Sequence, residues 1–267
     1  MTLRPALLAA AALAAALYAS LALGRWGAGE NRDLAAIARE LGRGDDLAPH
    51  IEVGRRRDET KRALAAEVVA GRMTVREAAD QFRRLDEADP FYPPDLPHPP
   101  GYERALRHSV LDWAWEVLGP QQRYAAAARW FAEVLTADPQ VLASTPPTPR
   151  YLAACAAAMA GCGQGRDAAD LDEQSRAGFR RQALDWVRAE LGSWHRLLEK
   201  EPGNALFVAR ELPTWLEDHY FAGVRGPDAL ARLPEPERQA WLKLWADVAD
   251  TLAQAEGTTA PGQRAGR

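Results

Sequence analysis

Two cysteines and two histidines are of the residue types that could hold a zinc ion. They are Cys155, Cys162, His195 and His219. Zinc sites usually take their ligands in pairs separated by short gaps, whereas six residues separate the two cysteines and neither has a histidine close by in the sequence. On one intact helix the two cysteines would lie roughly 10 Å apart, beyond the reach of a disulfide. We therefore interpret them as small core residues and predict no metal site.

The densest group of ionisable residues that could support acid–base chemistry is Glu217, Asp218 and His219, followed by Tyr220 and Phe221. Such chemistry requires a partner group brought close in a cleft, and no segment supplies one at a usable spacing. The chain also lacks a Gly-x-Ser-x-Gly elbow and a His-Glu-x-x-His pair. We predict a polar helix end with a surface histidine, no catalytic residue, no cofactor and no enzymatic activity.

A basic stretch at residues 54–62 and a Thr-Val-x-Glu-Ala-Ala run within 73–79 suggest a helix-turn-helix. A recognition helix should then follow a short turn after Phe82, but acidic residues and prolines follow instead. The formal charge of −4 and the pI near 5.8 provide no overall basic field. We predict that nucleic acid is not a partner, and we keep a cytoplasmic nucleic-acid regulator as the second alternative function.

The composition favours an all-α fold. Ala, Leu, Arg and Glu dominate and there are nine tryptophans, whereas the β-branched residues typical of a sandwich are not enriched. A chain of 267 residues has room for one large helical domain, or for a small one followed by a larger one. Most of the tryptophans fall at helical spacing, which indicates core and inter-repeat packing; the alternative is an aromatic ligand groove.

The segment 31–90 predicts a charged helical hairpin. Its apolar residues recur at helical spacing, at Leu64, Val68 and Val69 and again at Val75, Ala78, Ala79, Phe82 and Leu85. Between the two sets, Gly71 marks a stop, and Thr74 with Glu77 forms a capping-box signature. Six prolines between residues 89 and 101 then exclude both helix and central strand, so we interpret 91–101 as a stiff linker or a covering strap.

Helical periodicity returns after the linker and continues to about residue 256. Two helices meet at Gly119-Pro120, a further pair covers 151–160 and about 175–199, and a last helix contains Trp241 and Trp245. We predict a helical domain over 102–256. The small, polar tail at 257–267 is predicted to be disordered.

One repeat pattern fits part of this domain. In the tetratricopeptide (TPR) pattern, the second helix has a small residue, an aromatic residue four positions later and a proline at its end. Ala127, Phe131 and Asp138-Pro139 match it. The small residue lets two helices approach closely, and the aromatic ring fills the gap to the next hairpin. Tyr151, Ala154 and Cys155 match the start of a following unit.

Three stretches, in order, resemble the alanine-rich TPR tail found in some large-genome bacteria, often behind a serine/threonine kinase domain. They are 150–172, which contains Arg-Tyr-Leu-Ala-Ala-Cys, 181–188 and 233–248. The resemblance covers about 121–256 and implies a helical scaffold. Leu152 replaces the usual asparagine, and 202–220 follows the pattern poorly. The kinase motifs are absent from the sequence, so phosphoryl transfer is not implied.

The N-terminus predicts export or membrane anchoring. Arg4 precedes an apolar run at 6–23, and no acidic residue occurs before Glu30. Ser20 and Ala22 have the spacing that signal peptidase reads, while the run is also close to the length of a membrane span. Residues 1–23 are therefore a signal peptide or an inner-membrane anchor, with the bulk of the chain outside the cytoplasm. A buried alanine-rich helix is the alternative.

Together these features predict a non-enzymatic scaffold that binds another protein or a peptide through a TPR-like helical array. The first alternative is a ligand-binding or enzyme accessory domain with its site among the Trp-rich C-terminal helices.

The export signal can be tested with reporter fusions. Alkaline phosphatase joined after Arg32 should be active, because the positive charge at Arg4 favours retention of the N-terminus on the cytoplasmic side. A cytoplasmic reporter at the same junction should be inactive. The reverse pattern of activities would contradict export.

Overall fold

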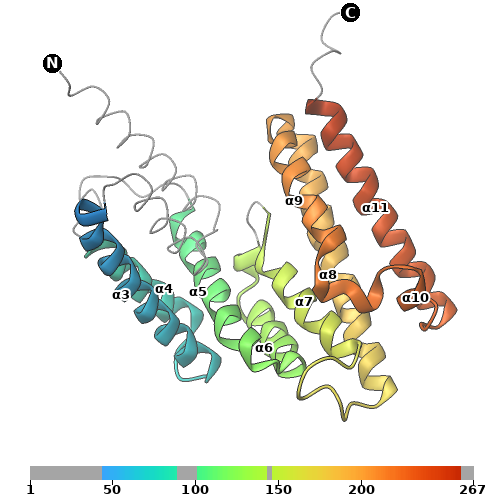
Figure 1. Ribbon diagram of the computed structural model, residues 1–267, viewed down its shortest axis with the longest axis horizontal. Coiled ribbons are helices and arrows are strands. Elements are labelled where there is room, and N and C mark those ends of the chain that lie inside the picture. The colour runs from blue at the N-terminus through green and yellow to red at the C-terminus, as the bar shows by residue number, and fades with distance from the viewer. Residues whose placement is uncertain (1–43, 89–100, 143–145, 260–267) are drawn as a thin grey trace, which may run out of the picture. The chain divides into compact units, whose positions relative to one another are not determined.

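The computed structural model describes residues 44–88, 101–142 and 146–259, and every element assigned within these ranges is helical (Figure 1). This confirms the all-α prediction. The chain divides into two compact units, Met1–Val117 and Leu118–Arg267. The predicted apolar segment 1–23, residues 91–100 of the predicted linker and the tail from residue 260 lie outside the described residues. Among the helices that are described, none is both long and apolar enough to cross a membrane.

In the first unit, helices α3 (Gly44–Val69) and α4 (Val75–Glu87) form a hairpin, followed by α5 (Tyr102–Leu118). The turn between α3 and α4 passes through Gly71 at φ 71°, a conformation that glycine adopts without strain. The expected capping box is present: Thr74 Oγ1 accepts from the Glu77 amide at 3.2 Å, and the Thr74 amide donates to Glu77 Oε2 at 2.8 Å. A short local motif thus starts α4.

A buried ion pair links the three helices that the structure describes in this unit. Lys61 Nζ on α3 donates to Asp86 Oδ1 on α4 at 2.9 Å, and the Tyr102 hydroxyl on α5 donates to Asp86 Oδ2 at 3.2 Å. The ammonium group also lies 5.1 Å from the centre of the Phe82 ring. Burial lowers the pKa of Lys61, and the charge of Asp86 counters this effect. Asp86 therefore joins α3, α4 and α5 in one polar contact.

The second unit begins with α6 (Tyr124–Ala137), which follows the short turn η1 (Gly119–Gln121). Ala127 and Phe131 are buried, and α6 ends at Asp138 with Pro139 opening the turn η2 (Pro139–Leu142), as the sequence pattern predicts. Arg123 at the N-cap position makes no side-chain cap. Asp167 supplies one instead, because its two carboxylate oxygens accept from the amides of Ala125 at 3.2 Å and Ala126 at 2.8 Å.

Helix α7 (Pro149–Gly161) packs against both α6 and α8 (Glu173–Lys200) (Figure 1). Small side chains make this possible. Its buried residues beyond Pro149 are Ala153, Ala154, Cys155, Ala156, Ala157, Ala158, Ala160 and Gly161. A Cβ atom added at Gly161 would lie 2.5 Å from Arg180 Cγ and 2.7 Å from the Arg180 amide nitrogen. Glycine is thus required where the end of α7 meets α8.

The C-terminal part contains η3 (Pro202–Asn204), α9 (Ala205–Glu217), η4 (His219–Val224), α10 (Pro227–Leu230) and α11 (Glu235–Thr259). Helix α9 packs mainly against α11, and η4 packs against α7. The segment 202–220, which fits the repeat pattern poorly, is thus mostly helical and includes Pro213 inside α9. Helix α11 continues to Thr259, so the first residues of the predicted disordered tail are helical.

Phe131→Ala should lower the free energy of unfolding by about 3 to 5 kcal/mol, because it empties a large, fully buried aromatic site. Urea unfolding followed by circular dichroism measures this change. Leu206→Ala is the control, and since Leu206 is 73% exposed its effect should stay within about 0.5 kcal/mol. Near-native stability of Phe131→Ala would contradict the packing of α6.

Candidate functional site

One gathering of polar and aromatic side chains in the second unit centres on Tyr151 of α7 and Asp218, which follows α9. The Tyr151 hydroxyl donates to Asp218 Oδ2 at 2.7 Å. The Tyr151 ring stacks on Trp215 with 4.8 Å between the ring centres, and meets Phe221 edge-on at 5.7 Å. Three helical segments thus converge on one phenol.

The contacts of Asp218 are those of a helix cap. Its Oδ1 accepts from the Tyr220 amide at 3.0 Å, which starts η4, while its Oδ2 accepts from Tyr151. Burial raises the pKa of Tyr151, and the negative charge of Asp218 raises it further. The phenol therefore keeps its proton at neutral pH. This pair holds η4 on α7.

The structure separates the three ionisable residues that the sequence groups together. Asp218 is directed at Tyr151, whereas Glu217 is exposed at the end of α9. The His219 side chain is 73% exposed, with Nδ1 3.6 Å from Asp218 Oδ1 and its ring centre 3.9 Å from that of Tyr220. His219 thus lies on the surface, and its position beside Asp218 gives no catalytic pairing with a buried nucleophile.

The two cysteines and two histidines, which are of types that can bind zinc, lie in different environments. Cys155 is buried in α7, Cys162 caps the C-terminus of the same helix, and both are free thiols. Burial raises the pKa of Cys155, and it raises that of Cys162 to about 11, so both thiols are protonated at neutral pH. His195 is exposed on α8 and lies 3.4 Å from Glu199. No group of three or more potential ligands occurs in the part of the chain that the structure describes.

The tryptophans at helical spacing are largely core residues. Trp113, Trp194, Trp215, Trp241 and Trp245 are buried. In the second unit, rings with centres 4.8 to 6.4 Å apart form a continuous chain that runs, in order, through Trp241, Trp245, Phe221, Tyr151, Trp215, Trp194 and Phe207. The chain connects α11, η4, α7, α9 and α8. Each ring fills space between helices, which is the role that the spacing predicts.

Arg180 is a buried charge that sequence reasoning missed. Its Nε donates to Glu237 Oε1 at 2.5 Å, Nη2 donates to Glu173 Oε1 at 2.7 Å, and Nη1 donates to the Gly161 carbonyl at 2.8 Å. One guanidinium therefore joins α7, α8 and α11. The sequence feature that could have indicated its burial is the spacing, because Arg180 precedes the buried Ala183 by about one helical turn and so lies on the same face of α8.

Glu190 is a further buried ionisable residue of the second unit, and its side chain is fully enclosed on α8. Its two oxygens accept from the Thr148 amide at 2.8 Å and from the Thr148 hydroxyl at 2.5 Å, while Arg150 Nη1 lies 3.5 Å away. Thr148 is also the N-cap of α7. Burial raises the pKa of Glu190, and the Thr148 bonds and the Arg150 charge counter part of that effect.

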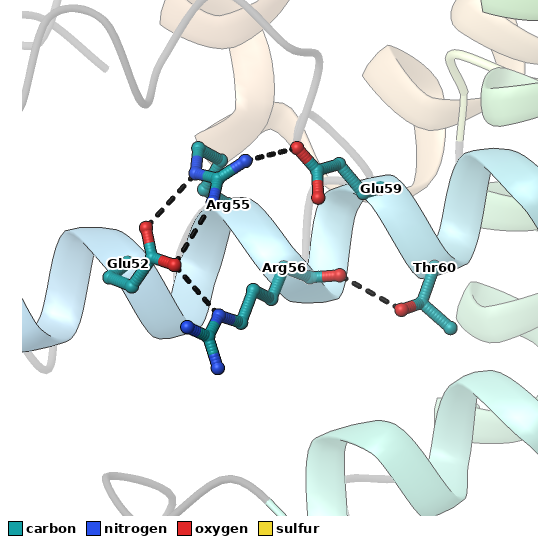
Figure 2. Close-up of polar contacts among 5 residues, drawn as sticks. All are labelled: Glu52, Arg55, Arg56, Glu59 and Thr60. Atoms are coloured by element: carbon teal, nitrogen blue, oxygen red, sulfur yellow. Dashed lines mark hydrogen bonds and ion pairs between the residues drawn. The ribbon is translucent and has the colours of Figure 1, made fainter.

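Arg55 and Arg56, two of the arginines considered for nucleic-acid binding, lie on α3 beside carboxylates that neutralise them (Figure 2). Arg55 and Arg56 both bond Glu52, at 2.9 Å and 2.7 Å, and Arg55 also pairs with Glu59. The hydrogen bonds from Arg55 and then Arg56 lower the pKa of Glu52 to about 2. This charge balance gives no support to a phosphate-binding surface, although the absence of a nucleic-acid partner stays a prediction.

The pH dependence of stability offers a test of the Glu190 contacts. A raised pKa means that the folded chain holds the Glu190 proton more tightly than the unfolded chain does. The contribution of Glu190 to the stability of the fold is therefore full below its ordinary pKa of 4.5. This contribution is lost as the pH rises through the higher pKa of the folded chain. Relative to Glu190→Gln, the wild-type chain should lose stability between about pH 4 and pH 7.

Urea unfolding of both proteins at the two pH values measures this difference. Glu133→Gln on exposed α6 surface is the matched control and should follow the wild type. A wild-type advantage that grows with pH would contradict the assignment.

Comparison with known proteins assigns the chain to no group. No family model, curated protein or solved structure matches it.

Proposed function

We propose that the chain is a non-enzymatic scaffold that binds another protein or a peptide through a TPR-like array of helical hairpins. The observation that carries this proposal is the position of α7, whose small residues are buried between α6 and α8. Consecutive helices that pack closely through small residues are the structural unit of TPR arrays, whose exposed faces bind extended segments or helices. The resemblance of 121–256 to alanine-rich TPR tails agrees with this reading.

The use of buried polar groups supports the same proposal. Arg180, Glu190 and Asp218 each have their hydrogen-bonding capacity directed at neighbouring helices. Their contacts fix the angles and spacing between helices, and so they define the shape of the surface. A scaffold depends on that shape, whereas an enzyme needs polar groups converging on a substrate.

The scaffold is proposed to be exported or tethered to the membrane. Residues 1–23 serve as the signal peptide or anchor, and the hairpin of 31–90 and the linker of 91–101 connect it to the helical domain of 102–256. The support for this arrangement is the apolar run that follows Arg4 and the proline content of the linker.

Affinity capture from a native membrane fraction, quantified by mass spectrometry, tests the proposal. Ala127→Trp forces a bulky ring into the buried face of α6. The neighbouring helices can then no longer keep their spacing, so partner capture should fall by about tenfold or more. The matched control is Ala137→Trp, because Ala137 is exposed on the same helix. His219→Ala should capture partners as the wild type does.

Two outcomes would contradict the scaffold. One is that Ala127→Trp and Ala137→Trp capture the same partners equally well, although circular dichroism shows that only Ala127→Trp has lost its native packing. The other is an enzymatic activity that His219→Ala removes with unchanged melting, which would place chemistry in the C-terminal helices.

A further inference from the structure

Helix α11 has apolar residues on two different faces. The inner face is buried in the second unit and consists of Trp241, Leu244, Trp245, Val248 and Ala255. The outer face, called here the α11 seam, consists of Leu242, Ala246, Ala249 and Ala253, all of which are exposed. Figure 1 shows α11 at an edge of its unit, beside α9. Leu242 is 45% exposed and is one of two large, exposed hydrophobic residues in the described ranges.

The spacing of the seam is that of a coiled coil. Successive members are four, three and four residues apart, which matches the a and d positions of a heptad and keeps them on one stripe. The outer face of a solvated helix normally carries polar residues at these positions. Alanine side chains also leave a shallow surface, so the backbone of a second helix can approach closely. The seam therefore fits another helix.

We propose that the occupant is a second copy of this chain, with the two α11 helices packed antiparallel about a two-fold axis. When the axis lies at the level of Asp247 and Val248, Leu242 of each copy faces Ala253 of the other, and Ala246 faces Ala249. The one bulky side chain of the seam then meets a small one at both ends. A parallel pair would instead place Leu242 against itself and leave the alanines without a filling partner.

The charges beside the seam agree with the antiparallel register. Arg238 and Glu256 lie along one edge, and Lys243 and Asp250 lie along the other. The two-fold axis brings Arg238 of one copy near Glu256 of the second, and Lys243 near Asp250 of the second. Lys243 already bonds Asp247 at 2.9 Å in its own helix, and its side chain is 71% exposed. Arg238 also pairs with Glu235 in its own helix, so the opposite charges on the two edges favour this register and orientation without fixing it alone.

The size of the contact sets the strength of the dimer. A single pair of helices buries less than roughly 1,200 Å², at the low end of specific interfaces, so the dimer dissociates on dilution. This inference goes beyond the proposed scaffold function and does not rest on it. A chain that fails to pair through α11 still retains the surfaces of α6, α7 and α8.

Sedimentation of the full-length chain in detergent, over a range of concentrations, tests the dimer. Ala249→Glu places a charge at the centre of the seam and should raise the dimer dissociation constant by about tenfold or more. Its melting temperature should match the wild type when both are monomeric, because Ala249 is exposed. Gln254→Glu adds the same charge on the exposed surface of α11 beside the seam, and it should leave the dissociation constant nearly unchanged.

Disulfide trapping tests the register. The Ala246→Cys and Ala249→Cys proteins carry tags of different lengths and are mixed and oxidised. The mixed dimer should predominate over either homodimer, because residue 246 of one copy faces residue 249 of the other. The wild-type chain, with its own Cys155 and Cys162, controls for background cross-linking.

Several results would overturn the proposal. They are a chain that stays monomeric at all concentrations, association that Ala249→Glu leaves unchanged, and predominant homodimeric cross-links, which indicate a parallel pair. Capture of a different protein that Ala249→Glu releases, without self-association, would assign the seam to that protein instead.

Discussion

The close approach of α7 and α8 is the constraint on which the second unit depends. Gly161 leaves no room for a side chain beside Arg180, and the Gly161 carbonyl accepts a hydrogen bond from the same guanidinium. The arginine then reaches Glu237 at the start of α11, so the contact of two helices also fixes a third. Removing one partner of a buried ion pair typically costs about 3 to 5 kcal/mol, since the other charge is left enclosed and unpaired.

Buried charge and small side chains have complementary roles in this unit. The alanines of α7 allow close packing but specify little about the angle or register of the neighbouring helices, because small apolar surfaces slide easily. Glu190 and Asp218 add directional contacts, to Thr148 at one end of α7 and to Tyr151 on the next turn. The arrangement of the helices thus follows from a few polar contacts within an otherwise apolar interior.

Local patterns predicted much of this fold. The capping box of Thr74 and Glu77, the helix end at Asp138 and the buried Phe131 depend on neighbours along the chain, which periodicity and capping rules describe. The contact of Glu190 with Thr148 spans 42 positions and that of Arg180 with Glu237 spans 57, so no local rule predicts them. Pro213 lies inside α9, where packing against α11 outweighs the tendency of proline to end a helix. Likewise, the sequence placed Asp218 and His219 together, but only the fold directs one inward and the other to solvent.

The cap that Asp167 provides for α6 has a consequence for the order in which the chain is completed. Synthesis produces α6 about forty residues before the carboxylate that accepts from Ala125 and Ala126. On the ribosome, the nascent helix therefore begins with unsatisfied amides at its N-terminus, and it can reach its final form only after the loop following α7 has emerged. Because that loop lies between α7 and α8, α6 reaches its final form only after all of α7 has been made.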